Sequence, residues 1–369
     1  MKTKILHIID GMTNRGGTEA VYMNIFRNIE RTEFQFDFLC MSKGEHVYAQ
    51  EIYSLGGKIF YLPSNRISRS KYFKLFFWRA SIRKFLKNNE YDVVHIHWDS
   101  AVSYFLAKGA LDAGIKKVIV HSHNSFAAHK TVHNFFKKRL SNLPIIKLAC
   151  SDDAGGWLFH SKNGNKDYKV IYNGINQKDY RFNMESRVSL RKEFGINDDA
   201  TVIGHVGRFE LQKNHSFLID VFCEYAKKNA NSILLLIGVG HLQNGISEKV
   251  KQLNLENQVK MLGARDNVKE LLNAMDVFLF PSLFEGLSVV SVEVQSNYLP
   301  LVQSSHLSPL SVISNKVKNI SLDDSLEKWV NAIDIAKSQR FEETIFNENY
   351  KKFDIIYTVE ELSKIYFQV

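Results

Sequence analysis

Short apolar segments alternate with longer amphipathic segments along the whole chain. The first half holds seven apolar runs that predict strands: KILHIID, FQFDFLC, KIFYLP, DVVHIHW, KVIVHSH, IKLACS and KVIYNG. Their nearly continuous apolar character is typical of parallel strands covered on both faces. The stretches 18–30 and 74–87 predict two of the intervening helices.

The second half repeats this alternation. Its predicted strands are TVIGHVG, SILLLIGVG, QVKMLG, DVFLFP and LPLVQS, with helices near 214–229, 246–254, 267–274 and 287–297. Two successive strand–helix–strand series predict an α/β fold of two doubly wound, Rossmann-like domains. The polar stretch after Asn173 is the expected hinge, and VEELSKIYFQV predicts a final amphipathic helix. Because ligands bind outside the carboxyl ends of such strands, we expect two domains facing a central cleft.

Composition excludes several classes of protein. The 369 residues are 45% hydrophobic and 24% charged, as is ordinary for a soluble globular protein. Three widely spaced cysteines argue against a disulfide framework and against a zinc site. No apolar run reaches the ~18 residues of a membrane span, and the start MKTKILHIID is too short for a signal peptide. We therefore expect a cytoplasmic protein.

The net charge of +9 is concentrated in the first half. Residues 1–180 hold 27 Lys+Arg against 15 Asp+Glu, a net charge of +12, whereas residues 181–369 carry −3. This asymmetry indicates an anionic partner for the first half. The candidates are a nucleic acid, an anionic membrane surface and a phosphorylated substrate.

The densest basic stretch is residues 65–87, NRISRSKYFKLFFWRASIRKFLK, which contains no acid. Apolar residues at 3-4-3 spacing predict a helix with one core-facing stripe, and further aromatic residues lie on its other faces. Aromatic residues among basic ones are typical of a helix in a membrane interface. A solvated basic helix is the alternative, and nucleic acid is not expected because no binding motif accompanies the charge. The residues expected to face the membrane are Lys71, Lys74, Arg83 and Lys84.

Candidate ligand contacts follow two strands of the first half. Gly16 and Gly17 precede a helix, where the backbone can approach an anion, although a Gly-Gly pair also makes an ordinary turn. No Lys-Ser or Lys-Thr follows, so this is not a P-loop. His121 and His123 end the strand KVIVHSH, and either could face the cleft. The chain has 13 histidines, so a satisfied structural histidine is the alternative.

Charged residues follow two strands of the second half. Arg208 and Lys213 come after TVIGHVG, where charge-assisted hydrogen bonds to a diphosphate would be worth roughly 1.5–3 kcal/mol each. Solvated surface cations are the alternative. After DVFLFP, Glu285 and Glu293 are expected on one side of a helix. Two carboxylates would repel a diphosphate, so they predict hydrogen bonds to sugar or ribose hydroxyls. The backbone N–H groups expected to begin this helix and to suit an anion belong to Gly286 and Leu287.

In this order, these motifs resemble those of the family 4 glycosyltransferases, which are retaining enzymes of the GT-B fold. The strongest motif is FPSLFEGLSVVSVEVQS, in which seven residues separate Glu285 from Glu293. GRFELQKN (207–214), VIYNGIN (170–176) and MLGARDNVKELLNAMDVFLFPS (261–282) complete a match over nearly the whole chain. HSHN, followed by a weakly patterned region, is similar to enzymes that build bacterial capsule and exopolysaccharide.

The resemblance implies a specific role for each candidate residue. Glu285 and His123 would act as catalytic residues that contact the transferred sugar, and Glu293 would bind the nucleotide ribose. Gly16 and Gly17 would line the donor phosphate or the acceptor. The residues implied to bind the donor diphosphate are Arg208, Lys213, Gly286 and Leu287, and those implied to frame the base are Arg265 and Val268.

The resemblance further implies the substrates and the domain roles. Residues 1–175 with a crossover helix at 355–369 would bind the acceptor, and residues 176–354 would bind the donor. The donor would be a nucleotide-diphosphate sugar, with UDP the commonest base, and the acceptor a lipid-linked saccharide at the inner face of the cell membrane. We expect no cofactor and no metal, because the sequence has no Asp-x-Asp and cationic residues can stabilise the leaving group.

Two departures from the family pattern and three competing functions accompany this assignment. Tyr298 stands where the family usually has glycine, and the following turn, Ser304 to Pro309, also lacks glycine.

Gly238-Val239-Gly240 is a partial dinucleotide fingerprint that would suit a nicotinamide dehydrogenase, but a plain turn explains it equally. A non-catalytic GT-B partner subunit at the membrane is the second competing function, and a sugar-nucleotide epimerase is the third.

Overall fold

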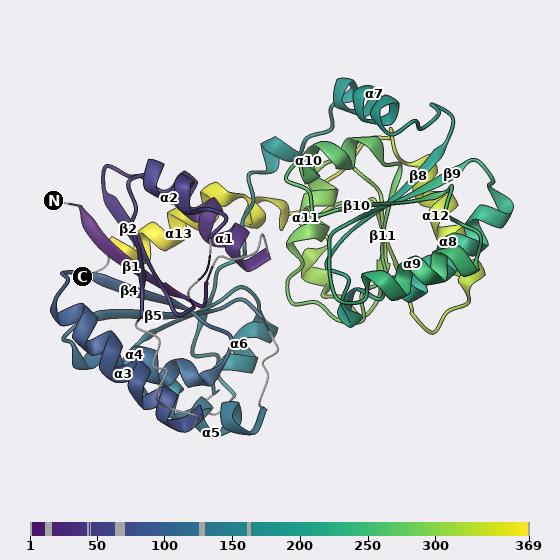
Figure 1. Ribbon diagram of the computed structural model, residues 1–369. Helices are drawn as coiled ribbons and strands as arrows, with labels where there is room; N and C mark the ends of the chain where they lie inside the picture. Colours follow the sequence, from purple (N-terminus) through teal and green to yellow (C-terminus); the bar gives the residue numbers. More distant parts are fainter. Residues whose placement is uncertain are drawn as a thin grey trace. The chain divides into compact units, whose positions relative to one another are not determined.

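The computed structural model describes residues 2–11, 17–42, 44, 46–62, 71–124, 130–160 and 164–367, and only the backbone at 18 and 71–74. These residues form two compact units (Figure 1). The N-terminal unit comprises Met1–Ile175 together with Asp354–Val369, and the C-terminal unit comprises Asn176–Phe353.

The N-terminal unit is built on a sheet of seven parallel strands in the order β3-β2-β1-β4-β5-β6-β7. In the register of this sheet, His7 lies opposite His95 and His97 lies opposite His121. The strands are β1 (Thr3–Ile9), β2 (Phe34–Cys40), β3 (Ile59–Tyr61), β4 (Val93–His97), β5 (Lys117–Ser122), β6 (Ile146–Ala149) and β7 (Lys169–Val170).

Helices cover both faces of this sheet (Figure 1). On one face, buried apolar residues of α3, α4, α5 and α6 pack against the strands in a common core. The other face carries α1 and α13, which contact each other. The helices are α1 (Gly17–Asn28), α2 (Ala49–Ser54), α3 (Lys71–Lys87), α4 (Tyr104–Asp112), α5 (Lys130–Ser141), α6 (Asp152–Leu158) and α13 (Ile355–Phe367), with the short 3-10 turn η1 (Ala101–Ser103).

The C-terminal helix α13 returns to the N-terminal unit beside the loop that follows β7. The Ile355 N–H donates to the Ile175 carbonyl at 2.9 Å, and the Thr358 hydroxyl donates to the Tyr172 carbonyl at 3.0 Å. A Cβ on Gly174 would meet the Thr358 Oγ1 at 2.3 Å. Glycine at 174 therefore lets the loop pass directly against the helix.

The C-terminal unit is built on six parallel strands in the order β10-β9-β8-β11-β12-β13. Apolar residues of α8, α9 and α12 form the core on one face, and those of α7, α10 and α11 form it on the other. The strands are β8 (Thr201–Val206), β9 (Ser232–Ile237), β10 (Val259–Gly263), β11 (Val277–Phe280), β12 (Leu301–Ser304) and β13 (Val317–Ile320). The helices are α7 (Met184–Glu193), α8 (His215–Lys228), α9 (Gln243–Gln252), α10 (Val268–Leu271), α11 (Val289–Ser296) and α12 (Leu326–Ser338), with 3-10 turns η2 (Gln177–Tyr180), η3 (Leu211–Lys213), η4 (Leu272–Ala274), η5 (Pro309–Ser311) and η6 (Tyr350–Phe353).

The predicted α/β fold with two doubly wound parallel sheets is confirmed. The start of α11 differs from the prediction, because the helix begins at Val289 rather than at 287. Ser288 caps it by accepting a hydrogen bond from the Ser291 N–H at 3.3 Å. Gly286 and Leu287 therefore lie in the loop before the helix, and Glu285 is not on the same helix as Glu293.

Tyr298 has a left-handed backbone, with φ of 62°, just after α11. This conformation suits glycine and costs a side-chain-bearing residue on the order of 1 kcal/mol or more. The geometry explains why a glycine is expected at this position. The Tyr298 ring contacts Phe346 with centroids 5.8 Å apart, so the side chain is held by aromatic packing.

Candidate functional site

Two loops at the carboxyl ends of neighbouring strands β8 and β11 are tied together by hydrogen bonds. The Leu283 N–H donates to the Gln212 carbonyl at 2.9 Å, and the Gln212 side chain donates to the Phe284 carbonyl at 3.0 Å. The Asn214 amide donates to the Pro281 carbonyl at 3.2 Å. These bonds fix the turn that carries Lys213 relative to the loop that carries Glu285.

Lys213 and Glu285 form an ion pair at this junction. The Lys213 Nζ lies 2.7 Å from Glu285 Oε1, and the two side chains are only 15% and 9% exposed. The ammonium also lies 4.8 Å from the Phe280 ring centroid. A Cβ on Gly207 would approach the Lys213 side chain to 3.1 Å, so the glycine leaves room for it. The structure thus brings together two residues that are 72 positions apart and were predicted to serve one donor site.

Three groups that lie close in sequence to this ion pair have hydrogen-bond donors without a partner among the described residues. Arg208 is exposed, and its guanidinium has no partner among the described residues. Within the same described ranges, the N–H groups of Gly286 and Leu287 donate no hydrogen bond. These N–H groups are loop amides rather than the first turn of α11, which corrects the predicted reason for their availability. Free amides and an unpaired guanidinium are suited to binding an anion.

Glu293 lies on α11 and is held by a tyrosine. The Tyr180 hydroxyl, on η2, donates to Glu293 Oε1 at 2.8 Å. Burial raises the pKa of the Glu293 carboxyl, and the hydrogen bond from Tyr180 opposes this shift. The second carboxylate oxygen has no hydrogen-bond partner in the part of the chain that the structure describes, which leaves an acceptor available for a hydroxyl.

The two residues predicted to frame the base lie near β10. Arg265 is exposed, and its Nε donates to the Leu262 carbonyl at 2.9 Å. Val268 begins α10 and packs against the apolar core that this face shares with α7 and α11. Arg265 is therefore free to reach a ligand, whereas Val268 contributes mainly to packing.

The pair Gly238 and Gly240 has a structural explanation. A Cβ on Gly238 would come within 2.1 Å of the Gly207 carbonyl oxygen, and a Cβ on Gly240 within 2.5 Å of the Phe209 carbonyl oxygen. The Phe209 N–H also donates to the Val239 carbonyl at 3.1 Å. These glycines make room for the neighbouring loop, which supports a turn rather than a dinucleotide fingerprint.

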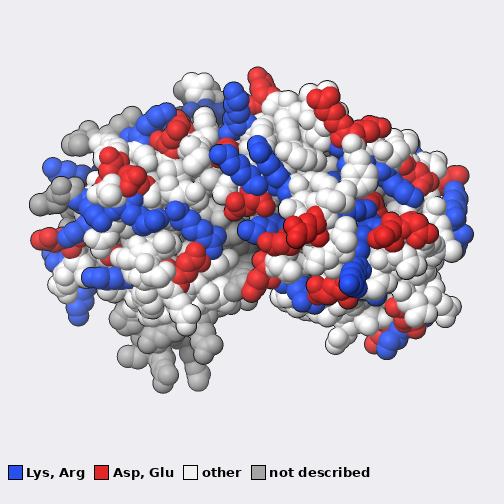
Figure 2. Space-filling model, turned by 90° about the horizontal axis from the view of Figure 1, so that it is seen from above, with Lys and Arg blue, Asp and Glu red and all other residues white. Residues whose placement is uncertain are grey.

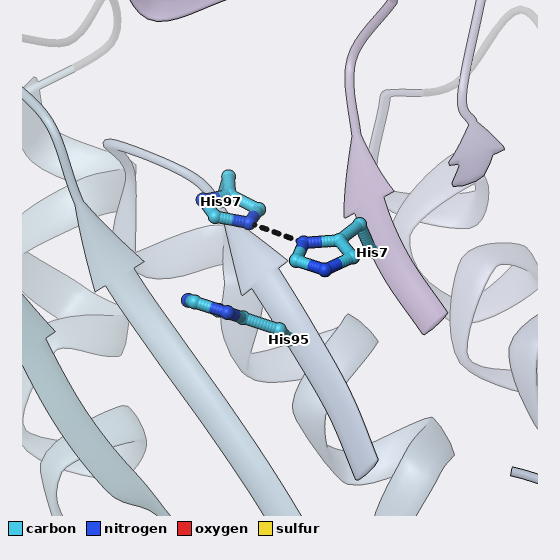
Figure 3. A group of neighbouring side chains, drawn as sticks. All are labelled: His7, His95 and His97. Carbon is cyan, nitrogen blue, oxygen red and sulfur yellow. Dashed lines mark hydrogen bonds between the residues drawn. The ribbon is translucent and has the colours of Figure 1, made fainter. Parts of the chain in front are cut away.

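In the N-terminal unit, five buried histidines lie on one face of three adjacent strands. Period-2 alternation places the pair on β4 and the pair at the end of β5 on the face that His7 occupies on β1. Figure 3 shows His7 and His97 meeting edge to edge above His95. The five residues are His7, His95, His97, His121 and His123.

The five imidazoles form two separate hydrogen-bonded chains. In the first, His7 Nδ1 meets His97 Nε2 at 2.9 Å, His97 Nδ1 meets His123 Nε2 at 2.8 Å, and His123 Nδ1 meets Asn173 Oδ1 at 3.1 Å. In the second, the Tyr366 hydroxyl meets His95 Nδ1 at 2.8 Å and His95 Nε2 meets His121 Nδ1 at 3.3 Å. The predicted residue His123 therefore has both ring nitrogens bonded to protein.

Burial keeps these imidazoles neutral. It lowers the pKa of His7 to about 3 and that of His123 to about 4, and it lowers the pKa values of the other three well below their usual range. Nearby, Asp99 accepts hydrogen bonds from the N–H groups of His123 at 2.7 Å and Asn124 at 3.0 Å. Burial raises the pKa of Asp99 to about 6, against the effect of these two bonds.

Nitrogen atoms of His7, His95 and His97, and those of His97, His121 and His123, lie within 4.8 Å of one another, as metal ligands could. Two imidazole ligands at Zn–N distances of about 2.0–2.1 Å in tetrahedral geometry would stand about 3.3 Å apart. The hydrogen-bonded nitrogens are closer, at 2.8 and 2.9 Å. A metal ion would have to break these bonds, so the arrangement fits a hydrogen-bond network better than a metal centre.

Sequence reasoning identified only one end of this network. It singled out His121 and His123, and it missed His7, His97 and Asn173. The signal was the pair of period-2 motifs HIH and HSH on strands that prove to be adjacent. Of the predicted glycines, Gly17 begins α1 and Gly16 lies outside the described residues.

The predicted basic helix is α3, on which Arg83 and Lys84 are exposed. The side chains of Lys71 and Lys74 lie outside the described part. Phe76 is 61% exposed on this helix, and α5, which also lacks acidic residues, exposes 59% of Phe135. On the face drawn in Figure 2, basic side chains form a band across the N-terminal unit with acidic side chains beside it, and both signs also intermingle over the C-terminal unit.

Among the described helices, none is both long and apolar enough to span a bilayer.

Two family profiles cover most of the chain. Residues 15–179 match Glycosyltransferase Family 4, and residues 186–353 match Glycosyl transferases group 1. The putative glycosyltransferase EpsF of Bacillus subtilis is 35% identical, over 89% of this chain and 86% of its own length. The capsular polysaccharide biosynthesis glycosyltransferase CapH of Staphylococcus aureus is 28% identical, over 98% of each chain.

Two further similarities extend over the full length. The UDP-Gal:α-D-GlcNAc-diphosphoundecaprenol α-1,3-galactosyltransferase of Escherichia coli is 23% identical, over 100% of this chain and 97% of its own. The crystal structure of Anabaena HepE in complex with UDP and glucose superposes with a TM-score of 0.79 at 18% identity, covering 100% of both chains. Together with the two doubly wound sheets, these similarities establish that the chain belongs to the family 4 glycosyltransferases and has the GT-B fold.

Proposed function

We propose that this glycosyltransferase moves a sugar from a nucleotide-diphosphate donor to a lipid-linked saccharide, with retention of anomeric configuration, in capsule or exopolysaccharide synthesis. The observation that carries the proposal is the largely buried Lys213–Glu285 ion pair, with a guanidinium (Arg208) and two amides (Gly286 and Leu287) on the same two loops that have no partner among the described residues. This group combines cationic donors for a diphosphate with a carboxylate for sugar hydroxyls.

Departure of the nucleoside diphosphate requires positive charge at the leaving oxygens. Arg208, Lys213 and the two loop amides supply it from preorganised positions, so a metal ion is not needed. Without donor, Lys213 is neutralised by Glu285 at 2.7 Å. When the diphosphate engages Lys213, the Glu285 carboxylate becomes available to accept hydrogen bonds from hydroxyls of the transferred sugar.

Retention follows if the acceptor hydroxyl attacks from the face of the leaving group. The departing phosphate oxygen then accepts the hydroxyl proton, and no covalent sugar–carboxylate intermediate forms. Glu293 binds the ribose hydroxyls through the carboxylate oxygen that Tyr180 does not occupy. We keep the prediction that His123 contacts the transferred sugar, for which one of its two hydrogen bonds to protein would have to be exchanged.

The proposed acceptor is a saccharide on a membrane lipid. The name of the Escherichia coli relative specifies such an acceptor, and the name of the Staphylococcus aureus relative specifies capsule synthesis. The acid-free helix α3, with exposed Arg83, Lys84 and Phe76, is suited to an anionic bilayer surface. We therefore place the enzyme at the inner face of the cell membrane.

The test of donor and reaction combines binding with turnover. Thermal unfolding is followed with UDP, GDP, dTDP, ADP and NAD and with their common sugar conjugates. A ligand at 100 times its Kd stabilises the protein by roughly 2.7 kcal/mol, which is readily measured. We expect stabilisation by UDP and by one UDP-sugar. That sugar should then be transferred, without added metal, to diphosphoundecaprenol-linked saccharide, and the anomeric proton of the product should show retention by NMR.

Two results would contradict this proposal. A folded sample that no nucleotide stabilises would favour the non-catalytic partner subunit. Stabilisation by a UDP-sugar with conversion of the donor in the absence of any acceptor would favour an epimerase.

Membrane attachment is tested by flotation with vesicles that contain anionic lipid. Reversal of Arg83 and Lys84 to Glu should reduce binding about 30-fold or more, because each basic residue near such a surface contributes about 1 kcal/mol. The matched control reverses Lys227 and Lys228, which are exposed on α8 of the C-terminal unit. Equal loss in both variants, or no flotation of the wild type, would contradict attachment through α3.

A further inference from the structure

The first histidine chain runs across the carboxyl edge of the N-terminal sheet. His7 lies near the end of β1, His97 ends β4, and His123 follows β5 directly. These strands are adjacent, and the chain ends on Asn173, in the loop after β7. Three side chains thus connect the buried centre of the sheet to a loop residue.

The hydrogen bonds fix the tautomer of each ring. The Asn173 Oδ1 can only accept, so His123 carries its proton on Nδ1 and presents a lone pair on Nε2. The same reasoning places a proton on Nδ1 of His97 and then on Nδ1 of His7. The chain is therefore directed, and each neutral ring donates toward Asn173. This requires all three rings to stay uncharged, which their burial ensures.

Maintaining this chain has a cost that a purely apolar core would avoid. The far nitrogen, His7 Nε2, is buried and has no hydrogen-bond partner among the described residues. An unsatisfied buried polar atom costs roughly 1–3 kcal/mol. Because every ring donates toward Asn173, His7 carries its proton on Nδ1 and its Nε2 carries only a lone pair. A buried acceptor without a partner costs less than a buried N–H without one. The hydrogen-bonded chain thus leaves His7 Nε2 unsatisfied at one end and fixes the orientation of Asn173 at the other.

Asn173 is the residue that this geometry holds. Its Oδ1 accepts from His123, and the loop around it is fastened by the Thr358–Tyr172 bond and by the close contact of Gly174 with α13. Its Nδ2 is not among the buried atoms lacking a partner, and no described residue accepts from it. The Asn173 amide therefore presents two N–H donors at the carboxyl edge, where ligands of open α/β sheets bind.

We infer that Asn173 is a substrate-binding residue that donates a hydrogen bond to a hydroxyl or ring oxygen of a sugar, and that His97 is a positioning residue acting on it through His123. The sugar contact rests on the proposed transferase function. The positioning of His123 and Asn173 by His97 does not. The second chain, from Tyr366 through His95 to His121, does not reach Asn173 and supplies a matched control.

The positioning is read directly by NMR of protein labelled with 15N-histidine, in which long-range 1H–15N correlations distinguish the two neutral tautomers. The His123 signals are assigned from a His123→Gln sample. Wild type should show His123 as the single Nδ1–H tautomer. His97→Phe removes the donor to Nε2 but leaves Asn173 as the acceptor for Nδ1–H, so the tautomer should persist and the His123 Nε2 resonance should shift downfield, toward that of an unbonded imine nitrogen. His95→Phe, an equally buried change two residues away on the same strand, should leave that resonance unchanged.

The sugar contact is read by transfer kinetics. Asn173→Asp keeps an acceptor for His123 but removes both N–H donors, and should lower kcat/KM about tenfold or more. His97→Phe should lower kcat/KM about tenfold, whereas His95→Phe should stay within about twofold of wild type. If His97→Phe does not fold, the sugar contact is still tested by kcat/KM of Asn173→Asp, and the hydrogen-bonded chain is still tested by the tautomer of His123 in wild type.

The outcomes separate the two parts of the inference. An Nε2–H tautomer of His123 in wild type, or an Nε2 resonance that His97→Phe leaves unchanged, would overturn the positioning role. A normal kcat/KM in Asn173→Asp would overturn the sugar contact. If the wild type transfers no sugar from any donor, the proposed function fails, while the NMR result still decides the role of His97.

Discussion

The carboxyl edges of the two sheets are built from opposite kinds of polar group. In the N-terminal unit the edge is lined by neutral imidazoles that hydrogen-bond one another, ending at Asn173. In the C-terminal unit the corresponding edge carries a largely buried ion pair, Lys213–Glu285, and the Tyr180–Glu293 hydrogen bond. The buried polar side chains are therefore mainly neutral imidazoles in one unit, with Asp99 beside them, and charged groups in the other.

The proposed function would account for this difference. A diphosphate would need cations and free N–H groups, and Lys213 would stay paired until that ligand binds, because a charge buried without a partner is costly. A sugar hydroxyl is neutral and is bound by directed hydrogen bonds. Neutral side chains can be buried more deeply, as the imidazoles are, without an ion-pair partner.

The largest effect is expected at the ion pair. Glu285→Ala should lower kcat about 100–1000-fold, because it removes an interaction with the sugar that is made as the donor bond breaks. The midpoint of thermal unfolding should change by only a few degrees. The measurement is steady-state transfer beside thermal unfolding, and the control is Glu256→Ala, an exposed carboxylate with no described ion pair. A collapse in stability that parallels the loss of activity would make Glu285 structural.

Acid should unfold the N-terminal unit before the C-terminal unit. Burial lowers the pKa values of six histidines in the N-terminal unit, the five of the network and His133, and of His205 and His215 in the C-terminal unit. A lowered folded-state pKa means that the unfolded chain binds more protons. The stability that the neutral histidines contribute is therefore fully present above their unfolded pKa near 6.5, and it is lost as the pH drops toward about 4. Each such histidine contributes up to about 1.4 kcal/mol per pH unit in that window.

The acid prediction is checked by hydrogen exchange resolved by peptide at pH 7, 6 and 5. Protection should fall more steeply in peptides of β1, β4 and β5 than in those of β8, β9 and β11. His121→Phe should reduce the slope for the N-terminal unit alone. An equal loss of protection in both units would remove the distinction between their polar edges.

The smallest effect is expected at Tyr180. Tyr180→Phe removes the hydroxyl that donates to Glu293 at 2.8 Å and leaves the ring in place. It should raise the KM for the donor about three- to tenfold, the worth of one hydrogen bond, with little change in kcat. The matched control is Tyr357→Phe, an exposed tyrosine on α13. A change in kcat without a change in KM would contradict a role in binding the nucleotide.

Sequence periodicity was sufficient to predict the fold. Continuous apolar runs separated by helical stretches identified nearly every strand, because buried parallel strands have this pattern wherever they occur. Helix ends were less accurately predicted: the start expected at 287 overlooked Ser288, a residue type preferred at helix N-caps, and α11 begins at Val289.

The candidate site residues of the C-terminal unit could be proposed from the sequence because each lies in a family motif. Arg208, Lys213, Glu285 and Glu293 were identified from family motifs, but the pairing of Lys213 with Glu285 depends on how the β8 and β11 loops meet. The histidine network depends on strand register. His97 lies opposite His121 only because β4 and β5 pair as they do, and no local pattern encodes that pairing.

The most direct test of the contrast between the two edges is the binding of UDP and of uridine, by calorimetry, to the wild type and to Lys213→Ala. We predict that wild type binds UDP at least about 100-fold more tightly than uridine, because the C-terminal edge would supply charge for the diphosphate. Lys213→Ala should weaken UDP about tenfold or more and leave uridine unchanged. Equal affinities for UDP and uridine, or a Lys213→Ala variant that binds UDP normally, would contradict it.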